Sequence, residues 1–218
     1  MQRKRTVLAL NTSQARAQTV CSSIHAFGGG SLAVGVYTLP RHNSGCIATQ
    51  LSRLGFAMSH EQRPIRNSNF DFDWQFTTGA KEPRAIMLHS VTNPLTFVPW
   101  CARAGIAHEF HAWAMAQVHE ANYVNREVEC MRIWTASHRQ IVALEPTCSF
   151  KAEELPARHI CELMHGAASC SRVPDMLNST DTCRSKHKYG CTSWDKLSEA
   201  DATGASEMRK LASELGYA

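Results

Sequence analysis

The sequence predicts an α/β protein with a parallel or mixed sheet near its amino end, flanking helices, one long central amphipathic helix and an irregular carboxyl third. Three observations predict this fold class. Strand-like and helix-like segments alternate in the first 91 residues, residues 100–145 contain no proline and a single glycine, and prolines interrupt the chain after residue 145. Alternation favours a parallel sheet, because parallel neighbours need a crossover connection that a helix supplies.

The amino-terminal elements are bounded by residues that end helices and strands. Three glycines at positions 28–30 follow the first helix-like stretch, Pro40 follows the second strand-like stretch, and Gly55 follows the second helix-like stretch. These boundaries predict strands at residues 5–10, 32–39 and 85–91, and helices at residues 14–27 and 46–54.

Aromatic residues alternate with polar ones between residues 70 and 76. A period of two predicts an edge strand or hairpin with one buried aromatic face. The opposite face would carry Asp71, Asp73 and Gln75, which we interpret as an exposed polar surface. The alternative is that the two carboxylates bind a cation or perform acid and base catalysis.

The central segment, residues 100–145, predicts one long helix or two helices broken near residues 122–125. His108, His111 and His119 share one face of it with Arg126, opposite an apolar stripe. The first two histidines have a spacing that suits one metal ion, but His119 lies about 12 Å further along a helix. We therefore interpret this face as solvated surface.

The chain is expected to form one main domain with an appendage. Residues 1–145 would be the main α/β domain, and residues 146–218 a helical or irregular extension of the same domain. Within this extension, helices are predicted at residues 156–165 and 206–215, each ended by a glycine, Gly166 and Gly216.

Composition excludes two classes of protein. Hydrophobic residues make up 44% and charged residues 19%, unlike disordered chains. No apolar run approaches the ~18 residues that cross a bilayer, so no membrane partner is expected, and residues 6–10 are too short for a secretory signal core.

Nine cysteines, an odd number, favour free thiols or metal ligands. We expect a soluble intracellular protein in a reducing compartment, most simply the cytoplasm.

Positive charge is concentrated in the amino-terminal part, because no acidic residue precedes Glu61. One interpretation is an organellar import sequence, which is rich in arginine and serine and poor in acid. A second is an anion-binding face for nucleic acid or a phosphorylated ligand. A third is an ordinary surface whose excess arginine keeps the protein soluble.

A turn rich in hydroxyl groups follows the first predicted strand, where a helix is expected to begin. Thr12, Ser13 and Arg16 lie in it. Hydroxyls, free backbone N–H groups and an arginine suit a phosphate group at a helix amino end. The turn resembles the phosphate loop of flavodoxins, although the usual glycine is absent, and this resemblance implies a phosphate-bearing cofactor or ligand. Ordinary helix capping by Thr12 and Ser13 is the alternative.

Two pairs of cysteine and histidine lie near the carboxyl end, Cys161 with His165 and Cys183 with His187. Four ligands of this chemistry suit a tetrahedral zinc ion. Neighbouring lysines and arginine would then suit a nucleic-acid-binding module. Independent buried thiols and surface histidines are the alternative, because a spacing of four residues also arises by accident in a chain with nine cysteines and eleven histidines.

These motifs leave three hypotheses of function. The leading one is a small-molecule enzyme or binding protein that holds a phosphate-bearing ligand at Thr12, Ser13 and Arg16, and the motifs do not decide between enzyme and binding protein. The second is a zinc-stabilised module that binds nucleic acid or a protein partner through residues 161–191. The third is that the chain has no evolved function, since no two of these features reinforce each other.

Overall fold

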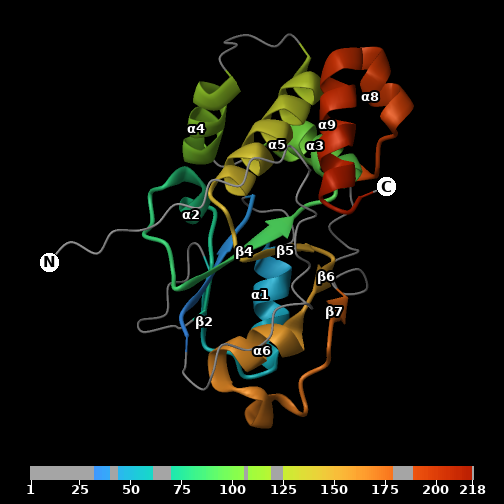
Figure 1. The fold of residues 1–218 in the computed structure, drawn as a ribbon. Helices are drawn as coiled ribbons and strands as arrows, with labels where there is room; N and C mark the ends of the chain where they lie inside the picture. Colours follow the sequence, from blue (N-terminus) through green and yellow to red (C-terminus); the bar gives the residue numbers. More distant parts are fainter. Residues whose placement is uncertain are drawn as a thin grey trace, which may run out of the picture.

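The computed structural model describes residues 32–39, 44–60, 70–105, 108–118, 125–178 and 189–217. The strand predicted at residues 5–10 and the helix predicted at residues 14–27 lie outside these residues. The described part is a mixed α/β structure, which confirms the predicted fold class (Figure 1).

Five parallel strands form the central sheet, in the order β2-β3-β1-β4-β5. Strands β1 and β4 confirm the predictions at residues 32–39 and 85–91. Strand β5 comes from the carboxyl third that we predicted to be irregular. The bounds are β1 (Val34–Tyr37), β2 (Met58–His60), β3 (Phe70–Phe72), β4 (Ile86–Val91) and β5 (Cys148–Lys151).

One face of the sheet is covered by α1 (Ser44–Arg53) and α6 (Ala157–His165), both confirmed near their predicted bounds. Side chains that alternate along the strands, such as Val36, Phe72 and Leu88, pack with these helices into an apolar core. A 3-10 helix, η2 (Ala167–Cys170), follows α6, and a small antiparallel pair, β6 (Glu154–Leu155) with β7 (Leu177–Asn178), lies beside it.

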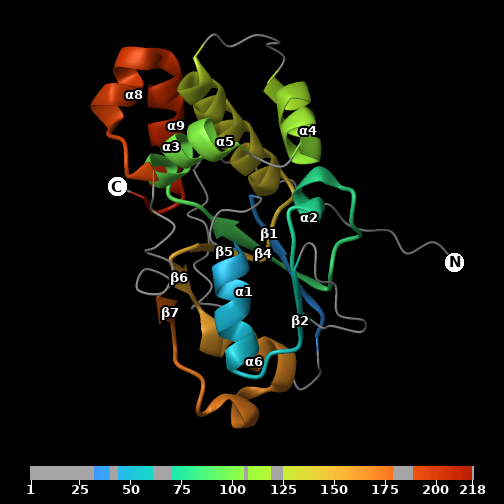
Figure 2. The ribbon, with the colours of Figure 1, turned by 180° about the vertical axis from the view of Figure 1, so that it is seen from behind.

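The opposite face of the sheet is covered by α2 (Gln75–Thr78) and by α5 (Arg126–Ala143). Buried residues of α5 also belong to a second large apolar core. Helices α3 (Pro94–Ala104), α4 (His108–Val118), α8 (Trp194–Ala200) and α9 (Ala202–Glu214) gather around α5 in that core. Figures 1 and 2 both show this group beyond the end of the sheet to which β4 points. Helix α9 confirms the helix predicted at residues 206–215 and begins four residues earlier, at a cap formed by Asp201.

The central segment confirms the two-helix alternative. Asn125 begins α5, since its side-chain oxygen accepts a hydrogen bond from the backbone N–H of Glu127 at 2.9 Å. A further break at Gly105, whose φ is 72°, separates α3 from α4. The division of the chain at residue 145 stays a prediction, and β5 and α6, which follow it, pack into the sheet and its core.

The predicted strand through residues 70–76 is wrong beyond Phe72. The Asp73 carboxylate accepts a hydrogen bond from the backbone N–H of Gln75 at 3.0 Å, and this local turn leads the chain into α2. The predicted exposed acidic face is also wrong. Asp71 and Asp73 are 1% and 2% exposed.

Candidate functional site

A row of polar side chains crosses the α5 side of the sheet. In the parallel register Tyr37 of β1 lies opposite His89 of β4, and His89 lies opposite Ser149 of β5. Successive side chains of a strand point to opposite faces, so these three share the face away from Leu88. His89 is fully buried, as is His138 of α5. Buried polar groups in a parallel sheet need partners, because an unpaired one costs about 1–3 kcal/mol.

These residues form one continuous hydrogen-bond chain. Ser149 Oγ lies 3.1 Å from His89 Nδ1, His89 Nε2 lies 2.8 Å from His138 Nδ1, and His138 Nε2 lies 3.4 Å from Thr92 Oγ1. The indole N–H of Trp134, one helical turn before His138, donates to the Thr92 carbonyl at 3.0 Å. The chain therefore joins the edge strand β5 to the end of β4 through two imidazole rings.

The His89 ring is neutral in this arrangement. Burial lowers the pKa of His89 to about 3, so its imidazole carries no charge at neutral pH. A neutral imidazole has one N–H and one bare nitrogen, and a chain of two such rings can orient all its protons in either direction. His89 can thus accept a proton from Ser149 while donating its other N–H to His138.

The strand order reverses between β1 and β4, because β2 and β3 lie on one side of β1 whereas β4 and β5 lie on the other. At the carboxyl end of β4, Asn93 begins α3 and accepts hydrogen bonds from the backbone N–H groups of Leu95 and Phe97, each at 2.9 Å. The Tyr217 hydroxyl donates to the Val91 carbonyl at 2.9 Å. These contacts occupy the Val91 carbonyl and the first backbone N–H groups of α3.

Two buried carboxylates of the same face are fully paired. Lys81 Nζ lies 2.9 Å from Asp71 Oδ1 and 3.3 Å from Asp73 Oδ2, and the Arg84 guanidinium binds the other oxygen of Asp71. Gly35 lies opposite Asp71 in the sheet, and the side chain of Arg84 passes over it. With Lys81 placed between them, the carboxylates hold the β3 to β4 connection and do not form a cation site.

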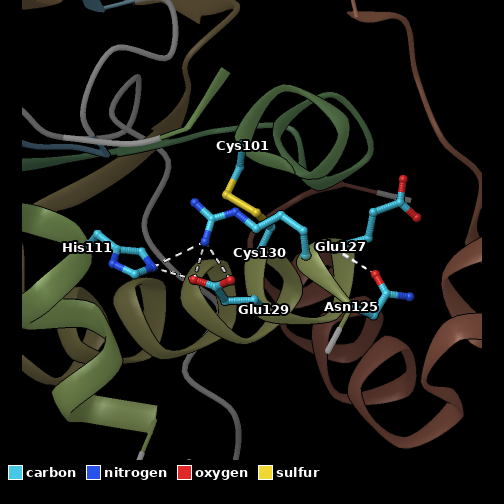
Figure 3. Close-up of a disulfide and its surroundings, with 7 residues drawn as sticks. Cys101, His111, Asn125, Glu127, Glu129 and Cys130 are labelled. Carbon is cyan, nitrogen blue, oxygen red and sulfur yellow. Dashed lines mark hydrogen bonds and ion pairs between the residues drawn. A yellow bond between two sulfur atoms is a disulfide. The ribbon is translucent and has the colours of Figure 1, made fainter. Parts of the chain in front are cut away.

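The histidine face of the central segment forms an ion-pair cluster between α4 and α5 (Figure 3). His111 Nε2 contacts the Glu129 carboxylate, and Arg126 Nη1 lies 2.5 Å and 2.6 Å from its two oxygens. Burial alone would raise the pKa of Glu129, but the hydrogen bonds from His111 and Arg126 outweigh it and hold that pKa below its usual value. His111, whose side chain is 32% exposed, thus lies on a partly solvated surface and is paired there with Glu129. His119 and the side chain of His108 lie outside the described residues.

The predicted phosphate seat, Thr12, Ser13 and Arg16, lies outside the described residues. Of the predicted zinc ligands, Cys183 and His187 also lie outside them, and His165 is exposed at the end of α6. Cys161 forms a disulfide with Cys170, and a sulfur in a disulfide offers no thiolate to a metal. Within the described ranges, no three histidine, cysteine or acidic side chains are grouped to hold a metal ion.

The prediction of free thiols is wrong for most described cysteines. Cys101 is joined to Cys130 between α3 and α5, Cys148 is also disulfide-bonded, and Cys191 is free and exposed. No helix in the described part of the chain is long and apolar enough to span a membrane. The intracellular location stays a prediction.

Sequence reasoning missed His89, His138 and Ser149. One signal was present, since His89 is the only ionisable residue in the apolar run at residues 85–91. Its partners lie 49 and 60 residues further along the chain, so their proximity follows from the strand order and from the placement of α5 on the sheet.

Comparison with protein-family models, curated proteins and solved structures finds no match. The hypotheses of function therefore rest on the geometry described above.

Proposed function

We propose that this chain is a small-molecule enzyme or binding protein that holds a phosphate-bearing ligand beside the carboxyl ends of its parallel strands. The observation that carries the proposal is the reversal of strand order between β1 and β4. In open parallel sheets, the loops that leave the two strands at such a reversal run in opposite directions and leave a crevice where ligands bind.

Charge supports an anionic ligand. The described N–H groups at the start of α3 are already bonded to Asn93, so this helix end does not supply the phosphate seat. We assign that role to Thr12, Ser13 and Arg16, which belong to an amino-terminal part with no acidic residue before Glu61. Hydroxyl, backbone N–H and guanidinium groups are the usual donors to phosphate oxygens.

Equilibrium dialysis of the full chain against radiolabelled ATP, FMN and inorganic phosphate tests the proposal. At least one of these probes should bind, and the triple variant Thr12→Ala, Ser13→Ala, Arg16→Ala should lose at least 90% of that binding. The matched control is Arg172→Ala, which removes one exposed positive charge after η2 and should retain the affinity. Thermal unfolding should show the same pattern, because a ligand at 100 times its Kd stabilises the folded state by about 2.7 kcal/mol.

Two results contradict the proposal. One is that none of the three probes binds to protein whose circular dichroism shows it to be folded. The other is that the triple variant binds as tightly as the original chain, since binding would then depend on groups other than Thr12, Ser13 and Arg16.

A further inference from the structure

The arrangement of Ser149, His89 and His138 meets the geometric requirements of nucleophilic catalysis. Such a site needs a hydroxyl within hydrogen-bond reach of a base, and a third group that orients the base. We propose that Ser149 is a nucleophile that accepts acyl groups from small activated esters, with His89 as its general base and His138 as the positioning residue. This proposal does not depend on the phosphate-bearing ligand.

One tautomer of each ring satisfies every distance. His89 keeps Nδ1 bare to accept the Ser149 proton at 3.1 Å and donates its Nε2 hydrogen to His138 Nδ1 at 2.8 Å. His138 then carries its own hydrogen on Nε2, directed at Thr92 Oγ1 at 3.4 Å. His138 also packs edge-to-face against Trp134, with ring centroids 4.4 Å apart, which holds its plane. In this orientation of the protons, the two nitrogens of His89 serve as base and donor.

Ser149 is the least buried member of this hydrogen-bond chain. It lies on β5, the outer strand of the five described, and remains 8% exposed. His89, His138 and Thr92 are 0% exposed. The base therefore lies beneath the nucleophile and is shielded from water, which keeps its hydrogen bonds free from competition.

The reaction balances with water as the second substrate. The Ser149 oxygen attacks the ester carbonyl carbon while its proton moves to His89 Nδ1, and an O–C bond forms. The bond from that carbon to the leaving oxygen then breaks, and the leaving alcohol takes the proton from His89. Water attacks the acyl-serine through the same base, which releases the carboxylic acid and restores Ser149.

The buried environment limits the substrates. Because burial lowers the pKa of His89 to about 3, this ring is neutral and ready to accept a proton at neutral pH, but it is a weak base. Weak bases suffice only where the leaving group departs readily, so p-nitrophenyl esters and fluorophosphonates are the appropriate probes. The rate should not change with pH between 5 and 8, since His89 stays neutral throughout.

Labelling of the full chain with a fluorophosphonate tests the proposal. The Ser149 oxygen would displace fluoride from phosphorus, so intact mass and peptide mapping should show one adduct per chain, on Ser149. Ser149→Ala should abolish that adduct, and His89→Gln should slow its formation at least tenfold. Ser90→Ala is the matched control, because it removes a buried hydroxyl of β4 that has no hydrogen-bond partner among the described residues, and it should label at the original rate.

His89→Gln protein that circular dichroism shows to be folded and that labels at the original rate overturns His89 as the base. Labelling of Ser149 in the unmodified chain needs no variant and so does not depend on whether His89→Gln folds. The variant His138→Gln should lower the rate at which Ser149 is labelled and should also change how that rate depends on pH. A purely structural role of His138 would lower the rate without changing its dependence on pH. Absence of an adduct on Ser149 in folded protein, or equal labelling of the Ser149→Ala protein, overturns the whole proposal.

Discussion

His89 Nε2 and His138 Nδ1 lie 2.8 Å apart, although the two residues are 49 positions apart in the chain and belong to a strand and a helix. This contact fixes how α5 lies on the sheet, because both rings are fully buried and each must use its nitrogens in hydrogen bonds.

Acid should destabilise the protein through His89. The pKa of His89 is lowered by burial from 6.5 to about 3 in the folded chain, so below pH 6.5 the unfolded chain binds a proton that the folded chain excludes. The free energy of unfolding should fall by about 1.4 kcal/mol per pH unit between pH 6 and 4 from this residue alone. Urea unfolding at several pH values measures it. His89→Gln should flatten the slope and the exposed control His165→Gln should not; equal slopes in all three proteins would refute the assignment.

Replacing buried serines by alanine should lower the free energy of unfolding only where the serine hydroxyl is hydrogen-bonded. Ser90 and Ser137 have buried hydroxyls without a partner among the described residues, so alanine at either position should leave the free energy of unfolding unchanged or raise it by up to about 1 kcal/mol. Ser149→Ala leaves His89 Nδ1 unpaired and should lower the free energy of unfolding by about 1–3 kcal/mol. Chemical denaturation of the three variants checks this difference, and three equal values would show that Ser149 is not bonded to the ring.

Gly35→Ala should destabilise the sheet. A Cβ at this position would lie 2.8 Å from Met87 Sδ and 2.9 Å from Arg84 Cγ, which crosses β1 to reach Asp71. We expect a loss of about 1–3 kcal/mol in the free energy of unfolding, as for other overpacked sites. The control is Gly45→Ala in α1, where the nearest atom is 3.8 Å away and helix propensity favours alanine. A neutral Gly35→Ala would show that Arg84 does not take this path.

Loss of the Cys101–Cys130 disulfide should cost more stability than loss of Cys161–Cys170. The first closes a sequence separation of 29 residues and the second one of 9. Loop-closure entropy then predicts losses of roughly 3–4 and 2–3 kcal/mol, respectively. Double alanine variants, unfolded under non-reducing conditions, measure each loss. Free-thiol titration of the unmodified chain provides the control, and a count that includes these four cysteines would contradict both bonds.

Local signals predicted several elements well. Strands β1 and β4 and helices α1 and α6 were found because glycine or proline ends the pattern near each of them. The alternation at residues 70–76 wrongly predicted a strand beyond Phe72, because a hydrogen bond to the Asp73 carboxylate turns the chain into α2. Strand β5 has only four residues, Cys148–Lys151, too few for a periodic pattern to indicate.

The candidate site was largely beyond sequence reasoning. Local patterns report on neighbours within one element, whereas Ser149, His89 and His138 meet through strand order and the placement of α5. The disulfides were missed for the same reason, because an odd number of cysteines says nothing about which ones meet. The Arg126 and His111 pairing was within reach, since both were placed on one face, but Glu129 was not recognised as its centre.

The position of β5 at the end of the sheet order also determines which strand edge is left unpaired while the chain is being translated. Strand β4 is translated before α3, α4 and α5, and its outer edge has no partner until β5 follows them. A nascent chain that has reached α5 thus exposes the apolar strand Ile86–Val91, a segment prone to pairing with other chains. Pauses in translation before Cys148 should favour aggregation, and pauses after Lys151 should not.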